Sequence, residues 1–310
     1  MIYTCTFAPS VDYTTYLPDF KPGKLNRSKQ VYYYPGGKGI NVSRVLKRLG
    51  EDNVALGFSG GFTGQYVADF LHDEGVATDF IPIEEITRIN VKIKSDAETE
   101  LNGPAPNILP EQRDALMDKV QAMKKGDWFV LAGTLPDSIP LEFFKKIAEL
   151  CQTNGIRLVL DTSGPALKEL VVLKPFLIKP NEHELGELFG IVISDKSDAY
   201  AYAKKLVEDG VENVIVSMGA DGALLVTKDA AVSAKAPKRQ VVNTVGSGDS
   251  LVSGFIASFV QQQDPQKAFR YGVASGSATA FRSDLCEKQD VEALLDQVQL
   301  DPFHEQDVTT

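Results

Sequence analysis

Cysteine is scarce in this chain. Its 310 residues contain three cysteines, which lie far apart at Cys5, Cys151 and Cys286. Thiols this few and this scattered do not form the disulfide framework of a small secreted domain. The opening segment, Met1 to Cys5, also lacks the basic residues that begin a signal peptide. We therefore expect a protein of the reducing cytoplasm.

Long apolar runs and an excess of positive charge are absent as well. No apolar run approaches the roughly 20 residues that span a bilayer, so we expect no membrane-spanning segment. Lysine and arginine number 32 against 42 acidic residues, which gives a net charge of −10 at pH 7. Nucleic acids and anionic membranes bind basic surfaces, so neither is an expected partner. An anionic ligand would need a local cluster of lysines and arginines.

The two common nucleotide-binding fingerprints are also missing. No Gly-x-x-x-x-Gly-Lys-Ser/Thr segment occurs, and Gly246-Ser247-Gly248 lacks the third glycine of Gly-x-Gly-x-x-Gly. After the first apolar segment comes Phe7-Ala8-Pro9-Ser10, where a dinucleotide-binding enzyme would carry its glycine turn. This argues against a nicotinamide-dependent oxidoreductase. If a nucleoside triphosphate binds, a different loop must hold its phosphates.

What the sequence does have is an alternation of strand-like and helix-like segments. The strand-like segments are near-continuous apolar runs, typical of strands covered on both faces: 128–132, 156–160, 176–178 and 214–217. Apolar residues spaced i, i+3, i+4 and i+7 predict helix faces at 42–49 and 144–151. This pattern predicts one α/β domain over 1–300, with a central, mostly parallel sheet flanked by helices.

Two segments depart from this alternation, at about 11–34 and 87–102. In the second, Ile89, Val91 and Ile93 alternate with polar residues, and a period of two is typical of a strand with one solvent-exposed face. We predict that both segments leave the main domain to form a small antiparallel β lid, which could cover a ligand or serve as a dimer surface. The polar residues 301–310 are predicted to be a frayed tail.

Small and polar residues follow each predicted strand. Ligands of an open parallel sheet bind beyond the carboxyl ends of its strands, so these residues are expected to line one cleft. Lys179 would contribute charge there, Asn181 and Glu184 would reach a water-bound metal, and residues 217–222 would leave room for a nucleotide base. Each also has a structural alternative. Asn181 and Glu184 have the spacing of a helix capping box, and the glycines of 217–222 suit a simple turn.

A glycine-rich loop, Asn243 to Asp249, runs into a helix-patterned stretch at 250–260. Its glycines let backbone amides converge on an anion, and the dipole of the first helical turn favours negative charge. Asp249, at the end of the loop, could take a proton as a general base. Taken alone, the segment also fits an ordinary helix start, where aspartate is common.

A second glycine cluster, Pro35 to Asn41, precedes the helix face at 42–49. Gly37 would let the backbone approach a ligand closely, Lys38 would supply a positive charge, and Asn41 would present both a donor and an acceptor. This combination suits a polyhydroxy substrate that carries a phosphate.

Three cations and one carboxylate lie in or beside the predicted lid strands. Lys24, Arg27 and Arg88 could neutralise a sugar phosphate, since arginine in particular matches phosphate oxygens with two parallel hydrogen bonds. Asp12, in the first lid strand, could accept hydrogen bonds from two sugar hydroxyls. For Asp12 and Arg27 taken singly, a solvated lid surface is the alternative.

Together these segments resemble the signature regions of the ribokinase-like (PfkB) carbohydrate kinases. The resemblance covers essentially the whole chain and is carried by three segments: Gly36-Gly37-Lys38-Gly39-Ile40-Asn41, Lys179-Pro180-Asn181-Glu182-His183-Glu184 and Asn243-Thr244-Val245-Gly246-Ser247-Gly248-Asp249. It implies a ribokinase-like fold, ATP as the phosphate donor and Mg²⁺ as its companion. It also implies that Asp249 is the catalytic base and that Gly246, Ser247 and Gly248 form the anion hole.

The resemblance further implies a nucleotide site and a metal site at the strand ends. Glu184 would hold Mg²⁺ through water. The residues implied to contact the nucleotide are Lys179, Asn181, Ser217, Gly219, Gly222 and Val245.

Within the family, the phosphosugar branch is indicated by residues 8–12, 23–27 and 87–90, which resemble the 1-phosphofructokinases most closely. The tagatose-6-phosphate kinases and the minor 6-phosphofructokinases come next. This implies phosphorylation of fructose 1-phosphate to fructose 1,6-bisphosphate by a homodimer that pairs through its lids. The implied substrate contacts are Asp12, Lys24, Arg27, Gly37, Lys38, Asn41, Arg88 and Asn102.

Two alternatives stay open at this point. β-Fructofuranose carries a hydroxymethyl group at each end of its ring, so local spacing alone does not separate a 1-phosphate from a 6-phosphate. A non-catalytic sugar-phosphate sensor would keep the cation cluster, yet it would not need Asp249, Asn181 or Glu184, and all three are present.

Overall fold

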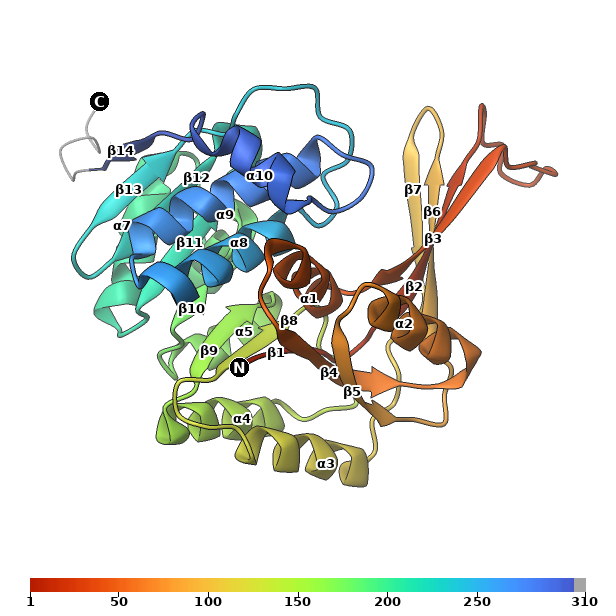
Figure 1. The fold of residues 1–310 in the computed structure, drawn as a ribbon, viewed down its shortest axis with the longest axis horizontal. Helices are drawn as coiled ribbons and strands as arrows, with labels where there is room; N and C mark the ends of the chain where they lie inside the picture. The colour runs from red at the N-terminus through yellow and green to blue at the C-terminus, as the bar shows by residue number, and fades with distance from the viewer. Residues whose placement is uncertain (304–310) are drawn as a thin grey trace.

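A ten-stranded sheet forms the centre of the computed structural model, which describes residues 1–303 (Figure 1). The strand order is β14-β13-β12-β11-β10-β9-β8-β1-β4-β5. Every pairing from β11 to β5 is parallel, and the pairings from β11 to β14 are antiparallel. The strands are Ile2–Thr6 (β1), Asn53–Ser59 (β4), Ala77–Pro82 (β5), Trp128–Ala132 (β8), Arg157–Asp161 (β9), Leu177–Ile178 (β10), Asn213–Ser217 (β11), Ala223–Thr227 (β12), Ala231–Ala234 (β13) and Leu300–Pro302 (β14).

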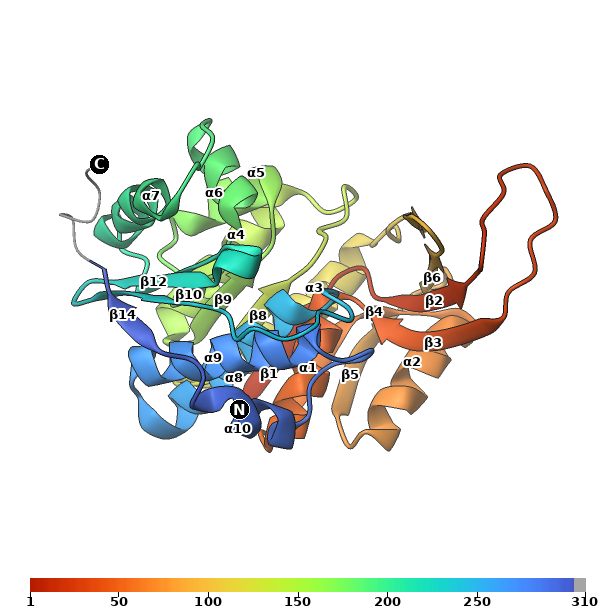
Figure 2. The same ribbon diagram turned by 90° about the horizontal axis from the view of Figure 1, so that it is seen from above.

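Helices cover both faces of this sheet, as Figure 2 shows. One face is covered by Pro110–Gln121 (α3), Leu141–Asn154 (α4), Gly164–Val171 (α5), Glu182–Phe189 (α6) and Lys196–Glu208 (α7). The other face is covered by Lys38–Leu49 (α1), Ser247–Gln262 (α8), Pro265–Ala280 (α9) and Lys288–Leu295 (α10). The helix Gly61–Asp73 (α2) packs against β5 and next to the second sheet, and a 3₁₀ turn at Gly219–Asp221 (η1) follows β11.

The fold class predicted from the sequence is confirmed. The apolar stripes at 42–49 and 144–151 lie on α1 and α4, and their apolar residues are buried on opposite faces of the sheet. The four predicted strands are β8, β9, β10 and β11, with bounds that differ by one residue or less. In the described part of the chain, none of the helices combines the length and the hydrophobicity that a membrane-spanning segment requires.

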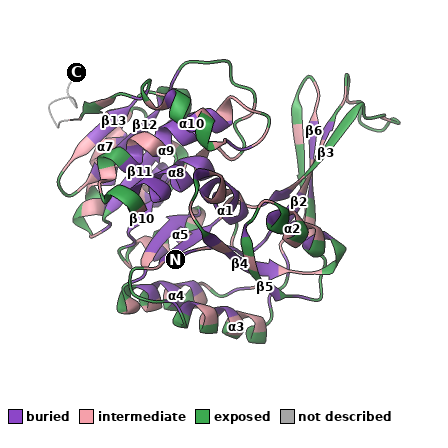
Figure 3. Cartoon of the chain, viewed as in Figure 1, coloured by how far each residue is buried: buried purple, intermediate pink, exposed green. Residues whose placement is uncertain are grey.

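A second sheet projects from the main one, here called the small sheet (Figures 1 and 3). Its order is β3-β2-β6-β7, with strands Gln30–Gly36, Ser10–Tyr16, Arg88–Lys94 and Glu98–Asn102. The two outer pairings are antiparallel, whereas the central pairing of β2 with β6 is parallel. The loop 17–29 between β2 and β3 reaches furthest from the main sheet (Figure 2).

The predicted tail differs from the structure at its beginning. The prediction that the chain is frayed from 301 onward is wrong for Asp301 and Pro302, which pair with β13 as part of β14. Phe303 then packs its ring against Tyr200. An edge strand is held by backbone hydrogen bonds, so its polar side chains gave no sign of it. The rest of the predicted tail, 304–310, lies outside the described residues.

Candidate active site

The candidate active site begins where α8 starts. Gly246, directly before the helix, has a φ of 79°, in the left-handed region that favours glycine. A Cβ on Gly246 would also come within 2.5 Å of the Leu285 side chain. Glycine is therefore needed for the chain to enter the helix in this way. The first amides of α8 have no intrahelical acceptors, and with the helix dipole they offer a site for an anion.

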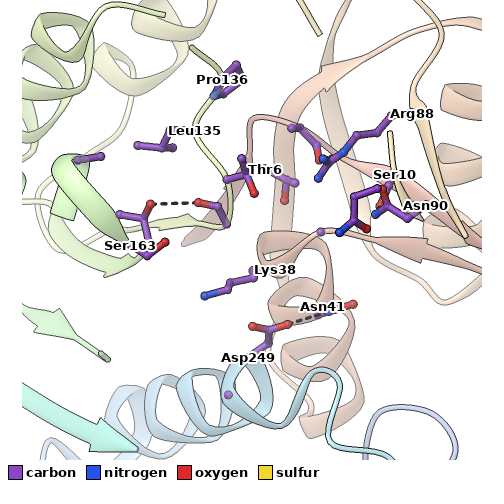
Figure 4. A pocket seen from close by; sticks show the side chains of 18 of the residues that line it. Thr6, Ser10, Lys38, Asn41, Arg88, Asn90, Leu135, Pro136, Ser163 and Asp249 are labelled. Carbon is purple, nitrogen blue, oxygen red and sulfur yellow. Dashed lines mark hydrogen bonds between the residues drawn. The ribbon is translucent and has the colours of Figure 1, made fainter. Parts of the chain in front are cut away.

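Asp249 lies in the first turn of α8 and is buried. Nδ2 of Asn41, in the first turn of α1, donates a hydrogen bond of 2.7 Å to its Oδ2 (Figure 4). Burial, and then the nearby charge of Asp161, raise the pKa of Asp249 to about 6, although Asn41 and two lysines act in the opposite direction. Such a carboxylate is mostly ionised at neutral pH and can still accept a proton, which suits a general base.

A second buried carboxylate, Asp161, lies at the end of β9. Its Oδ1 is 3.1 Å from Nζ of Lys38 and 3.3 Å from Nζ of Lys179. Burial acts to raise the pKa of Asp161, but the two ammonium groups outweigh burial and hold the pKa below its usual value. Burial acts to lower the pKa of Lys38, but the carboxylates of Asp161, Asp249 and Glu184 raise it. Lys38 is therefore a permanent positive charge beside Asp249.

Lys179 contacts the same carboxylate oxygen as Lys38. It follows β10, and its ammonium is placed so that a Cβ on Gly248 would be 3.3 Å from it. Both lysines thus point toward the first turn of α8 and are anchored there by Asp161. Sequence reasoning did not single out Asp161. The sequence did indicate it by position: Asp161 directly follows the apolar run at 156–160, and residues that follow parallel strands meet at the edge of the sheet where ligands bind.

Asn181 and Glu184 form the capping box that was the structural alternative for this pair. Oδ1 of Asn181 accepts a hydrogen bond of 2.8 Å from the Glu184 amide, and Oε2 of Glu184 accepts one of 2.9 Å from the Asn181 amide. The box starts α6, and Asn181 also bridges to Ser217 at the end of β11. Oε1 of Glu184 and Nδ2 of Asn181 are not used by this box.

Two cavities meet at the first turn of α8. One, of about 1000 Å³, lies between the main sheet and the small sheet, and the other, of about 1280 Å³, lies along the ends of β11 and α6. Gly248 lines both. Of the predicted residues, the first cavity contains Asp12, Gly37, Lys38, Asn41, Arg88, Asn102, Lys179, Val245, Gly246 and Asp249. The second contains Asn181, Ser217, Gly219, Gly222 and Ser247.

The glycines of the second cavity differ in what the backbone requires of them. Gly222 has a φ of 92°, and a Cβ there would come within 1.9 Å of the Ala234 carbonyl oxygen. Gly219 has a φ of 54° with open space around it. Gly222 is therefore required by the turn itself, as the structural alternative stated, because β13 passes too close for any side chain. This requirement does not depend on whether Gly222 also contacts a ligand.

The wall of the first cavity on the small sheet carries a compact polar cluster. Oδ1 of Asp12 accepts hydrogen bonds from Ser10 Oγ at 2.7 Å and from Asn90 Nδ2 at 3.0 Å. Oδ2 of Asp12 is 2.9 Å from Nζ of Lys92. Arg88 donates to the carbonyl oxygens of Ala8 and Gly103, and burial lowers its pKa. Figure 4 shows Arg88, Ser10 and Asn90 on this wall, away from Asp249.

Several residues that were predicted to contact the substrate or the nucleotide do not lie at the predicted position. Lys24 and Arg27 are exposed in the loop 17–29 and line neither cavity. Lys38, expected as a contact for the phosphorylated substrate, is paired with Asp161, and Val245 lines the first cavity although it was expected beside the nucleotide. Ser10, Asn90 and Lys92 were missed. The signal for Asn90 and Lys92 was the period-two alternation of 88–94, which puts them on one face with Arg88.

Known proteins resemble this chain in sequence and in fold. The family model described as pfkB family carbohydrate kinase matches residues 6–291. A 1-phosphofructokinase of Bacillus subtilis is 51% identical over 300 residues, which cover 97% of this chain and 99% of that protein. A D-tagatose-1-phosphate kinase of Bacillus licheniformis is 36% identical over 302 residues, 97% of this chain and 99% of that protein. The crystal structure of a putative phosphofructokinase from Staphylococcus aureus superposes with a TM-score of 0.87 at 41% identity, covering 98% of this chain and 99% of that one.

Proposed function

The chain belongs to the pfkB family of carbohydrate kinases, and on this premise we propose that it transfers the γ-phosphoryl group of ATP to fructose 1-phosphate, giving fructose 1,6-bisphosphate. The observation that carries this proposal is Asp249. It is buried where the two cavities meet, its pKa is raised to about 6, and the anion-binding end of α8 lies beside it. A base between an acceptor cavity and a donor cavity is what phosphoryl transfer to a hydroxyl requires.

The proposed reaction starts with the free primary hydroxyl of the phosphosugar against Asp249. The carboxylate takes the hydroxyl proton as the oxygen bonds to the γ-phosphorus, and the bond from that phosphorus to the β,γ-bridging oxygen breaks to release ADP. The amides of Gly246 to Asp249, together with Lys38 and Lys179, stabilise negative charge on the transferring group. Such transfer depends mainly on positioning and electrostatics, so a base of this strength suffices.

ATP is assigned to the second cavity, with its γ-phosphate at Gly248. Two buried polar atoms at this junction, Asp161 Oδ2 and Ser247 Oγ, have no hydrogen-bond partner among the described residues. The Ser247 hydroxyl could donate to a phosphate oxygen, and the Asp161 carboxylate oxygen could accept a hydrogen bond from water that hydrates the phosphates. The nucleotide contacts proposed from the sequence that line this cavity are Asn181, Ser217, Gly219 and Gly222.

Mg²⁺ fits this donor set. Mg²⁺ in kinases is held by few protein carboxylates and otherwise by phosphate oxygens and water. The unpartnered Oδ2 of Asp161 and the Glu184 oxygen outside the capping box are hard oxygen donors of this kind. Among the described residues no group of three or more His, Cys, Asp or Glu could hold a metal unaided, which also favours an ion that arrives with the nucleotide. The ion would neutralise charge on the β- and γ-phosphates.

The phosphosugar is assigned to the first cavity, with its ring hydroxyls on Asp12 and Asn41. Gly37 and Asn102 line the same cavity. The resident phosphate, meaning the phosphate that the sugar already carries, faces Arg88. An arginine buried enough to have its pKa lowered, yet using only part of its guanidinium for backbone carbonyls, retains donors for this phosphate.

A homodimer is proposed through the exposed face of the small sheet. Val31, Tyr33, Ile89 and Leu101 lie on one face of its strands and are between 39% and 59% exposed, an apolar content that monomeric surfaces seldom gather in one place. Face-to-face pairing of two small sheets would also carry the loop 17–29, with Lys24 and Arg27, toward the second copy. Sedimentation at micromolar concentration should give a dimer mass, and a monomer would contradict this assembly.

The cytoplasm is the proposed location. Cys5, Cys151 and Cys286 are all free and buried, and free thiols are typical of a reducing compartment. Fractionation of cells that express the chain should place its activity with the cytoplasmic enzymes.

A coupled assay for ADP release tests the proposed reaction. Fructose 1-phosphate should stimulate release more than fructose 6-phosphate, tagatose 6-phosphate or tagatose 1-phosphate do at equal concentration. Asp249→Asn serves as the control without a base. Preference for another of these sugars would reassign the substrate and keep the kinase. Binding of fructose 1-phosphate without ADP release from any of them would support the alternative of a sugar-phosphate sensor.

A further inference from the structure

The cations predicted to surround the resident phosphate do not gather in one place. Lys24 and Arg27 are exposed in the loop 17–29, outside the first cavity. Lys38 is bound to Asp161 beside the reaction centre. Arg88 alone lines the cavity from the small sheet among these four residues. A phosphate monoester carries between one and two negative charges at neutral pH, so one guanidinium leaves much of that charge unmatched.

Lys92 lies where a second cation is needed. It is 9% exposed, lines the first cavity, and is on β6 four residues from Arg88. Side chains two and four residues apart share one face of a strand, so Arg88, Asn90 and Lys92 form a single row facing the cavity. With side chains of this length, the guanidinium and the ammonium can both reach a phosphate placed over Asn90.

We propose that Lys92 is a specificity-determining residue that, with Arg88, binds the phosphate already carried by the sugar. This inference rests on the proposed function and names a residue that it left unassigned. It predicts that the phosphorylated end of the substrate lies at the small sheet, over Asn90, with the free hydroxyl at Asp249.

The contacts of Asp12 show how Lys92 can serve two partners. Ser10 and Asn90 hold Oδ1 of Asp12, and Lys92 contacts only Oδ2. An ammonium group has three donors, so a phosphate can be bound without loss of the pair to Asp12. Asp12 then keeps its orientation for sugar hydroxyls while the phosphate is bound beside it.

Glu100 adds a second negative charge near Lys92, so the positive charge of Lys92 is needed for this wall to bind a phosphate. It pairs with Lys92 across β6 and β7 and also lines the cavity. Without Lys92, the carboxylates of Asp12 and Glu100 would lie on this wall with no cation between them and would repel a phosphate. Lys92 therefore both attracts the substrate and cancels this repulsion.

The test compares Lys92→Met with Lys94→Met. Lys94 is on the same strand and is paired with Glu98, but it does not line the first cavity, so its variant removes the same charge from a matched position. Lys92→Met should raise the KM for fructose 1-phosphate by about 30-fold, with kcat within about threefold and the KM for ATP unchanged. Lys94→Met should change none of the three values.

A double-mutant cycle with Asp12→Asn separates phosphate binding from a role in orienting Asp12. If Lys92 contacts the phosphate, Lys92→Met should still raise the KM at least about tenfold in the Asp12→Asn background. An effect that disappears in this background would show that Lys92 serves Asp12 alone and would overturn the proposal. Lys92→Arg, which keeps the charge, should restore most of the affinity.

Calorimetric titration of fructose 1-phosphate provides a readout besides turnover, and thermal unfolding checks that each variant is folded. If Lys92→Met does not fold, Lys92→Gln and Lys92→Arg carry the same comparison. An unchanged affinity in a folded Lys92→Met variant overturns the inference and leaves the kinase intact. A wild-type protein that phosphorylates no ketohexose phosphate overturns the proposed function itself, so the two failures are distinguishable.

Discussion

The two walls of the first cavity are built differently. The wall with Asp249, Asp161 and Lys179 consists of helix starts and strand ends of the main sheet, and its charged groups are almost completely buried. The opposite wall belongs to the small sheet: Asn90 and Lys92, which face the cavity, are also buried, but the sheet projects from the main one and its outer strand β3 is mostly exposed (Figure 3). Burial strengthens electrostatic interactions and shifts pKa values, which chemistry needs. An exposed sheet can move and admit a substrate, which recognition needs. The comparison therefore predicts that changes to the first wall affect kcat and changes to the second affect KM.

The largest effect is expected from Asp249→Asn. The amide keeps the shape and the bond to Asn41 but cannot accept the proton, so kcat should fall by about 10²- to 10⁴-fold. ATP affinity, measured by equilibrium dialysis, should be unchanged. A kcat near that of the wild type would remove Asp249 from the mechanism.

Asp161→Asn should come next, with a fall in kcat of up to about 10²-fold. The substitution leaves Lys38 and Lys179 without their shared anchor and removes a negative charge that raises the pKa of Asp249. The acidic limb of the pH–kcat profile should therefore move to lower pH, which simple loss of folding would not produce. An unmoved limb would contradict the coupling of the two carboxylates.

On the second wall, Arg88→Ala should raise the KM for fructose 1-phosphate by about 30- to 100-fold and that for ATP much less. Arg113→Ala, at a half-buried position of α3 outside both cavities, is a control for loss of an arginine charge at a distance. Equal effects of Arg88→Ala on both KM values would contradict the expectation that the small-sheet wall binds the phosphosugar and not ATP.

The smallest effect concerns pH. The base must be ionised, so with the pKa of Asp249 near 6, kcat should be nearly constant above pH 7 and fall about tenfold per unit well below pH 6. Asn41→Ala removes a hydrogen bond that lowers this pKa, so the midpoint should move to higher pH and kcat at pH 7 should fall a few-fold. A midpoint near pH 4 in the wild type would contradict the raised pKa.

Arg44 illustrates what no local pattern predicts. Its guanidinium is 2% exposed and bonds to Glu74 at the end of α2 and to Asp284 before α10, and it lies over the rings of Tyr34 and Phe70. In the sequence, Arg44 is one polar residue of an amphipathic helix. Its burial depends on partners up to 240 residues away, which packing alone brings together.

The sequence by itself determined the elements and the types of chemistry. Apolar periodicity predicted α1, α4 and strands β8 to β11, because burial on one or both faces leaves a pattern in neighbouring residues. Glycine next to a carboxylate indicated the start of α8, because backbone conformation and helix dipole are local properties. The family resemblance added the roles of Asp249 and of the nucleotide site, which short patterns leave open.

Only the tertiary structure decided which charges meet. Asn41 and Asp249 are 208 residues apart, and nothing in either segment fixes their 2.7 Å contact. The structure placed Lys38 at Asp161, removed Lys24 and Arg27 from the cavity, and added Lys92 to it. Charge interactions act through space and depend on burial, so they are set by the packing of distant elements, whereas the pattern that makes each element is written in adjacent residues.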